Sequence, residues 1–192
     1  MPRLYLVRHG ETDWNLQGRW QGQADVALND HGRQQAQQSA VKLAAIPLEA
    51  IYSSDLSRAA ETARAIGRVN PAPLVLEPRL REIHQGEWQG LLVGEIQARY
   101  AEAYQQRRQN PLMMAAPGGE TTQQVRERAL AAVGDLLAAH PRGNVAVVSH
   151  GFTLAVLLTH FRKIPFEKVW DQVPHNAEII ELEIDPAQAD LG

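Results

Sequence analysis

Two histidines of the chain share one local pattern, in which an apolar run ends in a polar residue, a histidine and a glycine. LYLVRHG begins at residue 4 and VAVVSHG begins at residue 145. Arg8, next to His9, stays charged at any working pH and presents a planar fork of N–H donors that fits phosphate oxygens. A neutral imidazole beside a phosphate is a competent nucleophile and forms a covalent phosphohistidine. These residue types predict an anion site that can transfer a phosphoryl group.

A further arginine follows another short strand, in the stretch SSDLSRAAETA at 53–63. Ser54 or Asp55 is expected to cap a helix here, which places Arg58 in its first turns. A cation is ordinarily less favourable at the N-terminus of a helix than at its C-terminus. The early position of Arg58 is therefore better explained if its guanidinium binds an anion.

Phosphoryl transfer from an ester also requires a proton for the leaving alcohol. The stretch LREIHQGEWQG at 80–90 offers Glu82, Glu87 and His84 for this task. Carboxyl groups and imidazoles are common general acids, so the stretch predicts the proton donor without deciding between the three.

Short apolar runs and segments of helical periodicity alternate along the chain. Strands are predicted at 4–7, 50–53, 74–77 and 145–148, and helices at 30–46, at 55–69, from Val125 to Leu137 and directly after His150. EIIELEID at 178–185 alternates as a half-exposed edge strand does. This order predicts an α/β fold, a three-layer α/β/α sandwich around a mostly parallel open sheet.

In open α/β sheets, ligands bind beyond the carboxyl ends of the strands. His9 and His150 stand at such ends, and Gly10 and Gly151 are expected to let the backbone approach the ligand closely. We expect a single domain over 1–192, with a polar excursion at about 83–118 that covers the active site.

Composition excludes several classes of protein. The 192 residues contain no cysteine, which rules out disulfides and thiolate catalysis, and the net charge of −3 argues against a nucleic-acid partner. No apolar segment approaches the roughly 20 residues of a membrane span, and no charged leader precedes an apolar stretch. A soluble, cytoplasmic protein is expected, and the sequence leaves a homodimer open.

Taken together, these motifs resemble those of the histidine phosphatase superfamily, the phosphoglycerate-mutase-like proteins. The resemblance covers residues 3 to about 184 and rests on RHGETDWN at 8–15, QG at 21–22, SDLSRAAETA at 54–63, LREIHQGEWQG at 80–90, PGGET at 117–121 and VVSHG at 147–151. It implies that His9 is the phosphorylated nucleophile and that Glu82 is the proton donor. It implies further that the phosphoryl group and the substrate are held by Arg8, Arg58, His150, Asn15 and Gln21.

The resemblance implies no metal and no organic cofactor. A metal site built from His9, His84 and His150 with Glu82 is the competing interpretation. Two nearby arginines would repel the cation, and the spacing fits no common metal motif.

The phosphatase branch and the mutase branch differ in the excursion. The resemblance implies that mutases carry a tyrosine at the position of Gln85 and a lysine at that of Val93, both of which grip a substrate carboxylate. Their absence favours a metal-independent phosphomonoester hydrolase that acts on a small phosphorylated metabolite through a phosphohistidine. A cofactor-dependent phosphoglycerate mutase is the alternative.

Arg107 and Arg108 point toward the mutase, because such a pair could clamp a substrate carboxylate. The other interpretation of this pair is an exposed, solvated face of the excursion. Phe152, which directly follows VVSHG, is expected to place an apolar wall near the phosphate.

Overall fold

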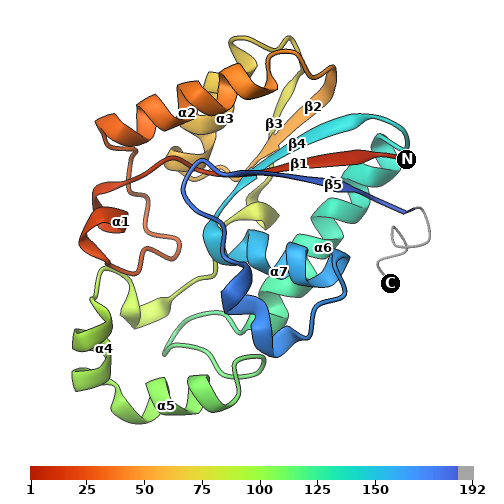
Figure 1. The fold of residues 1–192 in the computed structure, drawn as a ribbon. Coiled ribbons are helices and arrows are strands. Elements are labelled where there is room, and N and C mark those ends of the chain that lie inside the picture. Colours follow the sequence, from red (N-terminus) through yellow and green to blue (C-terminus); the bar gives the residue numbers. More distant parts are fainter. Residues whose placement is uncertain (186–192) are drawn as a thin grey trace.

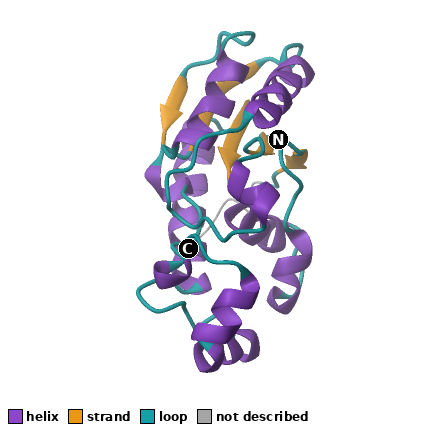
Figure 2. Cartoon of the chain, turned by 90° about the vertical axis from the view of Figure 1, so that its left-hand side faces the viewer, coloured by secondary structure: helices purple, strands orange, loops and turns teal. Residues whose placement is uncertain are grey.

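The computed structural model describes residues 1–185, which form a five-stranded sheet with helices on both faces (Figures 1 and 2). The strands lie in the order β3-β2-β4-β1-β5. Their bounds are β1 Arg3–Arg8, β2 Leu48–Ser53, β3 Leu74–Leu76, β4 Asn144–Ser149 and β5 Ile179–Glu183. β1, β2, β3 and β4 run parallel to one another, and β5 runs antiparallel to β1. The predicted mostly parallel sheet is confirmed.

Helices cover both faces of this sheet and the region beyond its carboxyl end. Their bounds are α1 Asp13–Gln17, α2 Asp30–Leu43, α3 Ser57–Gly67, α4 Val93–Arg99, α5 Ala101–Gln109, α6 Thr122–Ala139 and α7 Gly151–Phe161, with short 3₁₀ helices η1 Pro78–Leu80, η2 Gly86–Trp88 and η3 Phe166–Gln172. No helix within residues 1–185 is long and apolar enough to cross a membrane.

The three layers follow from the two-residue period of the central strands. In β1, Leu4 and Leu6 pack with α6 and α7, whereas Tyr5 and Val7 pack with α2 and α3 on the other face. A strand that is covered on both faces needs apolar side chains at successive positions, which explains the unbroken run before Arg8. In the edge strand β5, one side is apolar and Leu182 joins the α6 and α7 side of the core, as predicted.

Two helix starts show how side chains satisfy the free N–H groups of a first turn. Asn29 caps α2 by accepting a hydrogen bond from Gly32 N at 2.7 Å. The prediction for α3 is wrong, because Leu56 is its N-cap residue and offers no side-chain acceptor. Instead, Asp25 accepts from Ser57 N at 2.8 Å across the chain. Asp55 is bound to Arg81.

The segment 83–118 lies beyond the carboxyl end of the sheet, at the bottom of Figure 1, and contains α4 and α5. Trp88 is fully buried there, in a small apolar cluster with Ile96 and Ala116. Trp20 packs against Trp88 with ring centroids 5.7 Å apart. The polar excursion therefore has a core of its own, which also contacts the loop after α1.

Candidate active site

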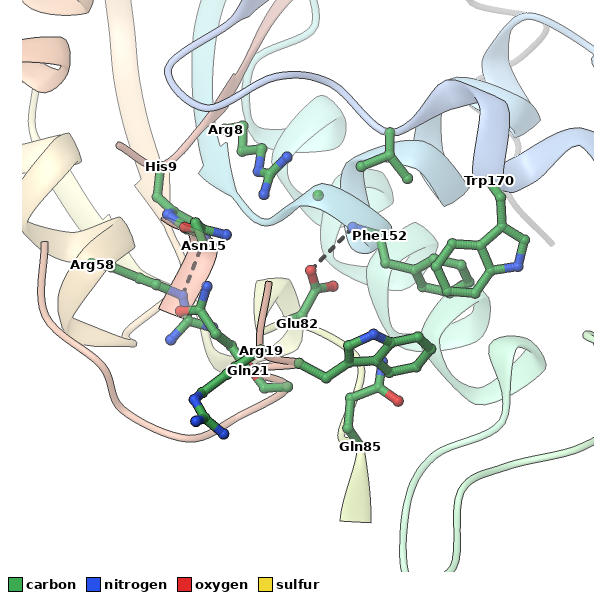
Figure 3. A pocket seen from close by; sticks show the side chains of 14 residues that line it. Arg8, His9, Asn15, Arg19, Gln21, Arg58, Glu82, Gln85, Phe152 and Trp170 are labelled. Atoms are coloured by element: carbon green, nitrogen blue, oxygen red, sulfur yellow. Dashed lines mark hydrogen bonds between the residues drawn. The ribbon is translucent and has the colours of Figure 1, made fainter. Parts of the chain in front are cut away.

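A cavity of about 160 Å³ opens where β1 and β4 end (Figure 3). Fourteen residues line it: Arg8, His9, Asn15, Arg19, Trp20, Gln21, Gly22, Arg58, Glu82, Gln85, Gly151, Phe152, Trp170 and Val173. Of the predicted site residues, the structure brings Arg8, His9, Asn15, Gln21, Arg58 and Glu82 together in this cavity. They come from strand ends and from the segments that follow them, as the sheet topology requires.

The hydrogen bonds of His9 define which ring nitrogen lacks a proton. Nδ1 lies 2.6 Å from the carbonyl oxygen of Gly10, which can only accept, so Nδ1 carries the proton. Nε2 then has a lone pair, and Arg58 Nε donates to it at 3.3 Å. The ring thus presents an unprotonated nitrogen at the base of the cavity.

The surroundings of His9 keep the imidazole neutral. Burial lowers its pKa well below the ordinary value of 6.5, and the positive charges of Arg58 and Arg8 lower it further. The hydrogen bond to Gly10 acts in the opposite direction but is the weakest of these influences. At neutral pH the ring is therefore uncharged and can act as a nucleophile.

Arg58 is fixed by the loop that precedes α2. Its Nη1 donates to Ala24 O and its Nη2 to Gly22 O, each at 2.8 Å. Burial lowers its pKa to about 10, so the guanidinium remains charged at neutral pH. A fixed cation beside His9 is suited to hold an anion without reorganising.

Arg8 is fixed at one end only. Its Nη1 donates to Pro174 O at 2.6 Å, while its Nε is buried and has no hydrogen-bond partner within residues 1–185. A Cβ atom on Gly151 would lie 3.3 Å from Arg8 Cζ and 3.0 Å from Val173 Cγ1. The glycine therefore makes room for the guanidinium.

Gly10 serves another purpose than the one predicted from the sequence. A Cβ atom there would lie 2.3 Å from Gly32 O, in the first turn of α2. Gly10 therefore lets the loop after β1 approach α2 closely, and not the backbone approach a ligand. Packing of α2 therefore requires this glycine.

His150 lies beside His9 but does not line the cavity. The two ring centroids are 5.1 Å apart in an edge-on arrangement, and His150 is completely buried. Its Nε2 lies 2.8 Å from Ser54 Oγ, and its Nδ1 has no partner in the described part of the chain. Burial, followed by the charge of Arg58, lowers its pKa well below 6.5.

Glu82 is bound to the N-terminus of α7. Its Oε2 accepts from Phe152 N, and its Oε1 accepts from Thr153 N, each at 3.1 Å. Thr153 Oγ1 is 3.2 Å from the same Oε1. Two N–H groups in the first turn of α7 are therefore occupied by this carboxyl group, as the dashed line in Figure 3 shows for Phe152.

The other two candidates for the proton donor lie outside the cavity. His84 Nδ1 accepts from Gly86 N at 3.1 Å, and Glu87 is exposed and interacts with Tyr100. Neither of them lines the cavity. Of the three, the geometry favours Glu82.

An ion pair behind the site fixes the loop that carries Glu82. Arg128 donates to the carbonyl oxygens of Arg79 and Arg81, each at 2.7 Å, and to that of Glu82 at 3.0 Å. Its partner Glu120 accepts from it at 2.9 Å and from His84 N at 2.8 Å. The PGGET motif therefore contributes through Glu120, which stabilises this loop without entering the cavity.

Asn15 and Gln21 line the cavity as predicted. The Oδ1 of Asn15 accepts from Thr12 N at 3.1 Å in the capping box of α1, and Asn176 Nδ2 is 3.3 Å from it. The amide nitrogen of Asn15 is thus the end available to a ligand. Gln21 is buried, and its Oε1 has no partner among residues 1–185.

Arg107 and Arg108 do not reach the cavity that contains His9. Arg107 is 5% exposed and donates to Gln85 Oε1 at 2.7 Å, and Arg108 is exposed. Both line a separate, adjacent cavity. The alternative of a solvated face is wrong for Arg107.

Part of the cavity wall was not predicted from the sequence. Trp170 and Val173 come from the segment between α7 and β5, which has neither clear periodicity nor a recognisable motif. Only a tryptophan between two prolines, at 165 and 174, marks it in the sequence. The predicted apolar wall at Phe152 is present, because Phe152 lines the cavity and packs against Trp170 with ring centroids 4.4 Å apart.

Residues 1–185 contain no group of three or more His, Asp or Glu side chains placed to hold a metal ion. His84 does not line the cavity that contains His9, and its Nδ1 accepts from Gly86 N. The side chains that do surround the cavity include three arginines.

Known proteins resemble the chain over most of its length. Residues 4–191 match the model of the histidine phosphatase superfamily, branch 1. Phosphoserine phosphatase 1 of Hydrogenobacter thermophilus is 32% identical over 95% of this chain and 88% of its own length. Phosphoglycerate mutase-like protein 4 of Arabidopsis thaliana is 37% identical over 83% of this chain and 70% of its own length.

A solved structure shows the same fold. The mycobacterial glucosyl-3-phosphoglycerate phosphatase determined with VO₃ superposes with a TM-score of 0.86 at 34% identity, covering 94% of this chain and 90% of its own. Since a family model spans nearly all of the sequence and the strand-end arginine and histidine stand where the motif predicts, the chain belongs to the histidine phosphatase superfamily.

Proposed function

We propose that the protein hydrolyses phosphomonoesters of a small metabolite through a phosphohistidine on His9, without a metal ion. The observation that carries the proposal is the state of the His9 ring. Its Nδ1 proton is bound to Gly10 O, and its unprotonated Nε2 accepts from Arg58 Nε in the cavity. A neutral, oriented nucleophile beside a fixed cation is what attack on a phosphoryl group requires.

The phosphoryl group would lie against Nε2 of His9, with its oxygens bound by Arg8 and Arg58. The unpartnered Arg8 Nε supplies one N–H donor there. Two guanidinium groups neutralise charge on the transferring oxygens, which is the main demand of phosphoryl transfer. The amide groups of Asn15 and Gln21 complete the ring of donors.

His150 would contribute through its Nδ1. Ser54 Oγ already accepts from Leu56 N at 3.3 Å, and its own proton can go to His150 Nε2. In that tautomer Nδ1 carries the proton of the His150 ring and has no other partner within residues 1–185. A donor in this state, next to His9, can bind a phosphoryl oxygen once the substrate is present.

Glu82 would move the proton. As His9 Nε2 bonds to phosphorus, the bond to the leaving oxygen breaks, and that oxygen takes the proton from Glu82. Oε1 of Glu82 accepts from two backbone N–H groups, those of Ile83 and Thr153, whereas Oε2 accepts only from Phe152 N, so we assign the transferred proton to Oε2. In the second step Glu82 takes a proton from water, which attacks phosphorus and frees His9.

Hydrolysis is favoured over transfer to a second hydroxyl group. A mutase must retain its substrate while the phosphoenzyme lasts, and Gln85 and Val93 offer no charge for this. Neither Val93 nor Arg107 lines the cavity that contains His9. Each missing charge-assisted contact weakens retention by roughly 1.5–3 kcal/mol. Water therefore reaches the phosphoenzyme first.

The test is phosphate release from a panel of phosphomonoesters in the presence of EDTA. The panel contains phosphoserine, 3-phosphoglycerate, a sugar phosphate and a nucleoside 5′-monophosphate. We expect release by the parent and by His31→Ala, a surface control, and a loss of several orders of magnitude in His9→Ala. Substantial release by His9→Ala, or complete loss with EDTA, would contradict the proposal.

A further inference from the structure

A second cavity, of about 430 Å³, adjoins the one that contains His9. Its lining residues are Trp20, Trp88, Tyr104, Arg107, Arg108, Pro111, Glu167 and Trp170. Trp20 and Trp170 also line the first cavity, so the two spaces meet at these rings. The reaction at His9 uses none of the residues that belong to the second cavity alone.

The boundary between the cavities is aromatic. The ring centroids of Trp20 and Trp170 are 6.2 Å apart, and those of Phe152 and Trp170 are 4.4 Å apart. Figure 3 shows Phe152 and Trp170 side by side on the wall opposite His9. Trp170 is 42% exposed, although a large apolar side chain usually buries more of its surface. An organic group that leaves the phosphoryl site on this side meets flat aromatic surfaces.

Arg107 forms a polar floor behind these rings. Its Cζ lies 5.4 Å from the ring centroid of Trp20, 5.3 Å from that of Trp88 and 5.9 Å from that of Trp170. Arg107 is only 5% exposed, and its Nη2 has no hydrogen-bond partner within residues 1–185. The indole Nε1 of Trp88 is also buried and has no hydrogen-bond partner in the described part of the chain. Buried donors without partners are uncommon, so this floor is polar as well as aromatic.

The same arginine orients Gln85. Arg107 has donors only, so the Gln85 amide must present its oxygen to it, at 2.7 Å. The NH₂ end of the Gln85 amide is then directed away from Arg107. Gln85 itself lines the first cavity. The side of the site that faces the leaving group therefore offers donors and indole rings, with Glu167 as the one carboxylate that lines the second cavity.

The two volumes differ in what they can hold. The first cavity, with its arginines, suits a phosphoryl group, and the second is of the size that small organic ligands occupy. The leaving group of phosphoserine or phosphoglycerate has only three carbon atoms and would leave the second cavity unfilled. Planar rings stack favourably on tryptophan, which adds to the gain from burial.

We infer that the second cavity is the leaving-group subsite and that it takes a planar ring-bearing alcohol, whose ring packs against Trp20 and Trp170. This inference rests on the proposed function and specifies its substrate class. Arg107 acts as a positioning residue in this subsite, because it holds Gln85 and the indole rings without reaching the reacting atoms.

The test compares 2-phenylethyl phosphate with propyl phosphate, whose leaving alcohols have similar acidity and differ mainly in the ring. We expect kcat/KM for phosphate release to be about tenfold higher or more for the ring substrate. Trp170→Ala should remove most of this preference for the ring substrate, and Trp170→Phe should retain it. Equal kcat/KM values in the parent, or an unchanged preference in Trp170→Ala, would overturn the inference.

A binding experiment separates this inference from the proposed reaction. Three of the four tryptophans line the second cavity, so intrinsic fluorescence reports its occupancy. Titration with 2-phenylethylphosphonate, which cannot be hydrolysed, should quench fluorescence at about tenfold lower concentration than titration with propylphosphonate. Release of no phosphate from any substrate would contradict the proposed function. Equal binding of the two phosphonates would contradict the subsite.

Discussion

At the scale of single residues, the reactivity proposed for His9 comes from the partners of its two ring nitrogens. Gly10 O fixes the proton on Nδ1, and Arg58 approaches Nε2. The sequence could predict these residue types and their place at strand ends. It could not predict that His150 would lie behind His9, because burial and ring orientation depend on how α7 packs.

Glu82→Gln tests the proton donor at this scale. The amide keeps the size of the side chain but cannot deliver a proton to the leaving oxygen. We expect turnover of an alkyl phosphate to fall roughly 10²–10⁴-fold and that of p-nitrophenyl phosphate far less, because nitrophenolate leaves without a proton. Steady-state kinetics on both substrates measures the difference.

Glu87→Gln is the matched control, since Glu87 is exposed and outside the cavity. It should leave both activities unchanged. Equal losses on both substrates in Glu82→Gln would mean that Glu82 orients the start of α7 and does not donate the proton.

At the scale of elements, the N-terminus of α3 shows what a local pattern misses. The sequence offered Ser54 or Asp55 as its cap, and both are used elsewhere, Ser54 by His150 and Asp55 by Arg81. The acceptor is Asp25, 32 positions before Ser57. Because the same loop holds Arg58 through Gly22 O and Ala24 O, this cap also ties the helix to the active site.

Asp25→Ala should therefore lower the free energy of unfolding by about 1 kcal/mol, the usual cost of a lost N-cap acceptor. Asp25→Asn keeps an oxygen that can accept from Ser57 N and should lose much less. Urea denaturation of the three proteins measures both values. Equal stability of the alanine variant and the parent would show that water replaces the carboxylate at no cost.

The elements that the sequence predicted are those whose pattern reflects burial. β1, β4 and α7 are covered on nearly every side, so their apolar runs were easy to assign. α4 and α5 belong to a polar segment with a small core around Trp88, and tertiary packing rather than periodicity determines them. For the same reason Trp170, on η3, could not be placed at the active site before the structure was known.

At the scale of the whole molecule, two buried neutral histidines make stability depend on pH. The folded-state pKa values of His9 and His150 are lowered well below 6.5, so below that pH the unfolded chain binds protons that the folded chain does not. The free energy of unfolding should therefore be highest above about pH 6.5 and should fall as the pH decreases below that value. Each histidine contributes a slope of about 1.4 kcal/mol per pH unit.

Urea denaturation at pH 7, 6 and 5 tests this dependence. The carboxylates with lowered pKa values, Asp55 and Glu77, are protonated only at more acidic pH and do not affect this window. His160, whose pKa burial also lowers, adds to the slope. His150→Gln should make the slope shallower by about 1.4 kcal/mol per pH unit, and an unchanged slope would show that His150 is not the group that titrates.

The central claim is that His9 carries the phosphoryl group between substrate and water. Rapid mixing with a ³²P-labelled substrate from the panel, followed by an alkaline quench, should trap a labelled protein. The label should be lost in acid, as a phosphoramidate bond is, and a peptide map should place it on residue 9. His31→Ala should be labelled like the parent and His9→Ala should not. Label on another residue, or turnover without any labelled intermediate, would contradict the account.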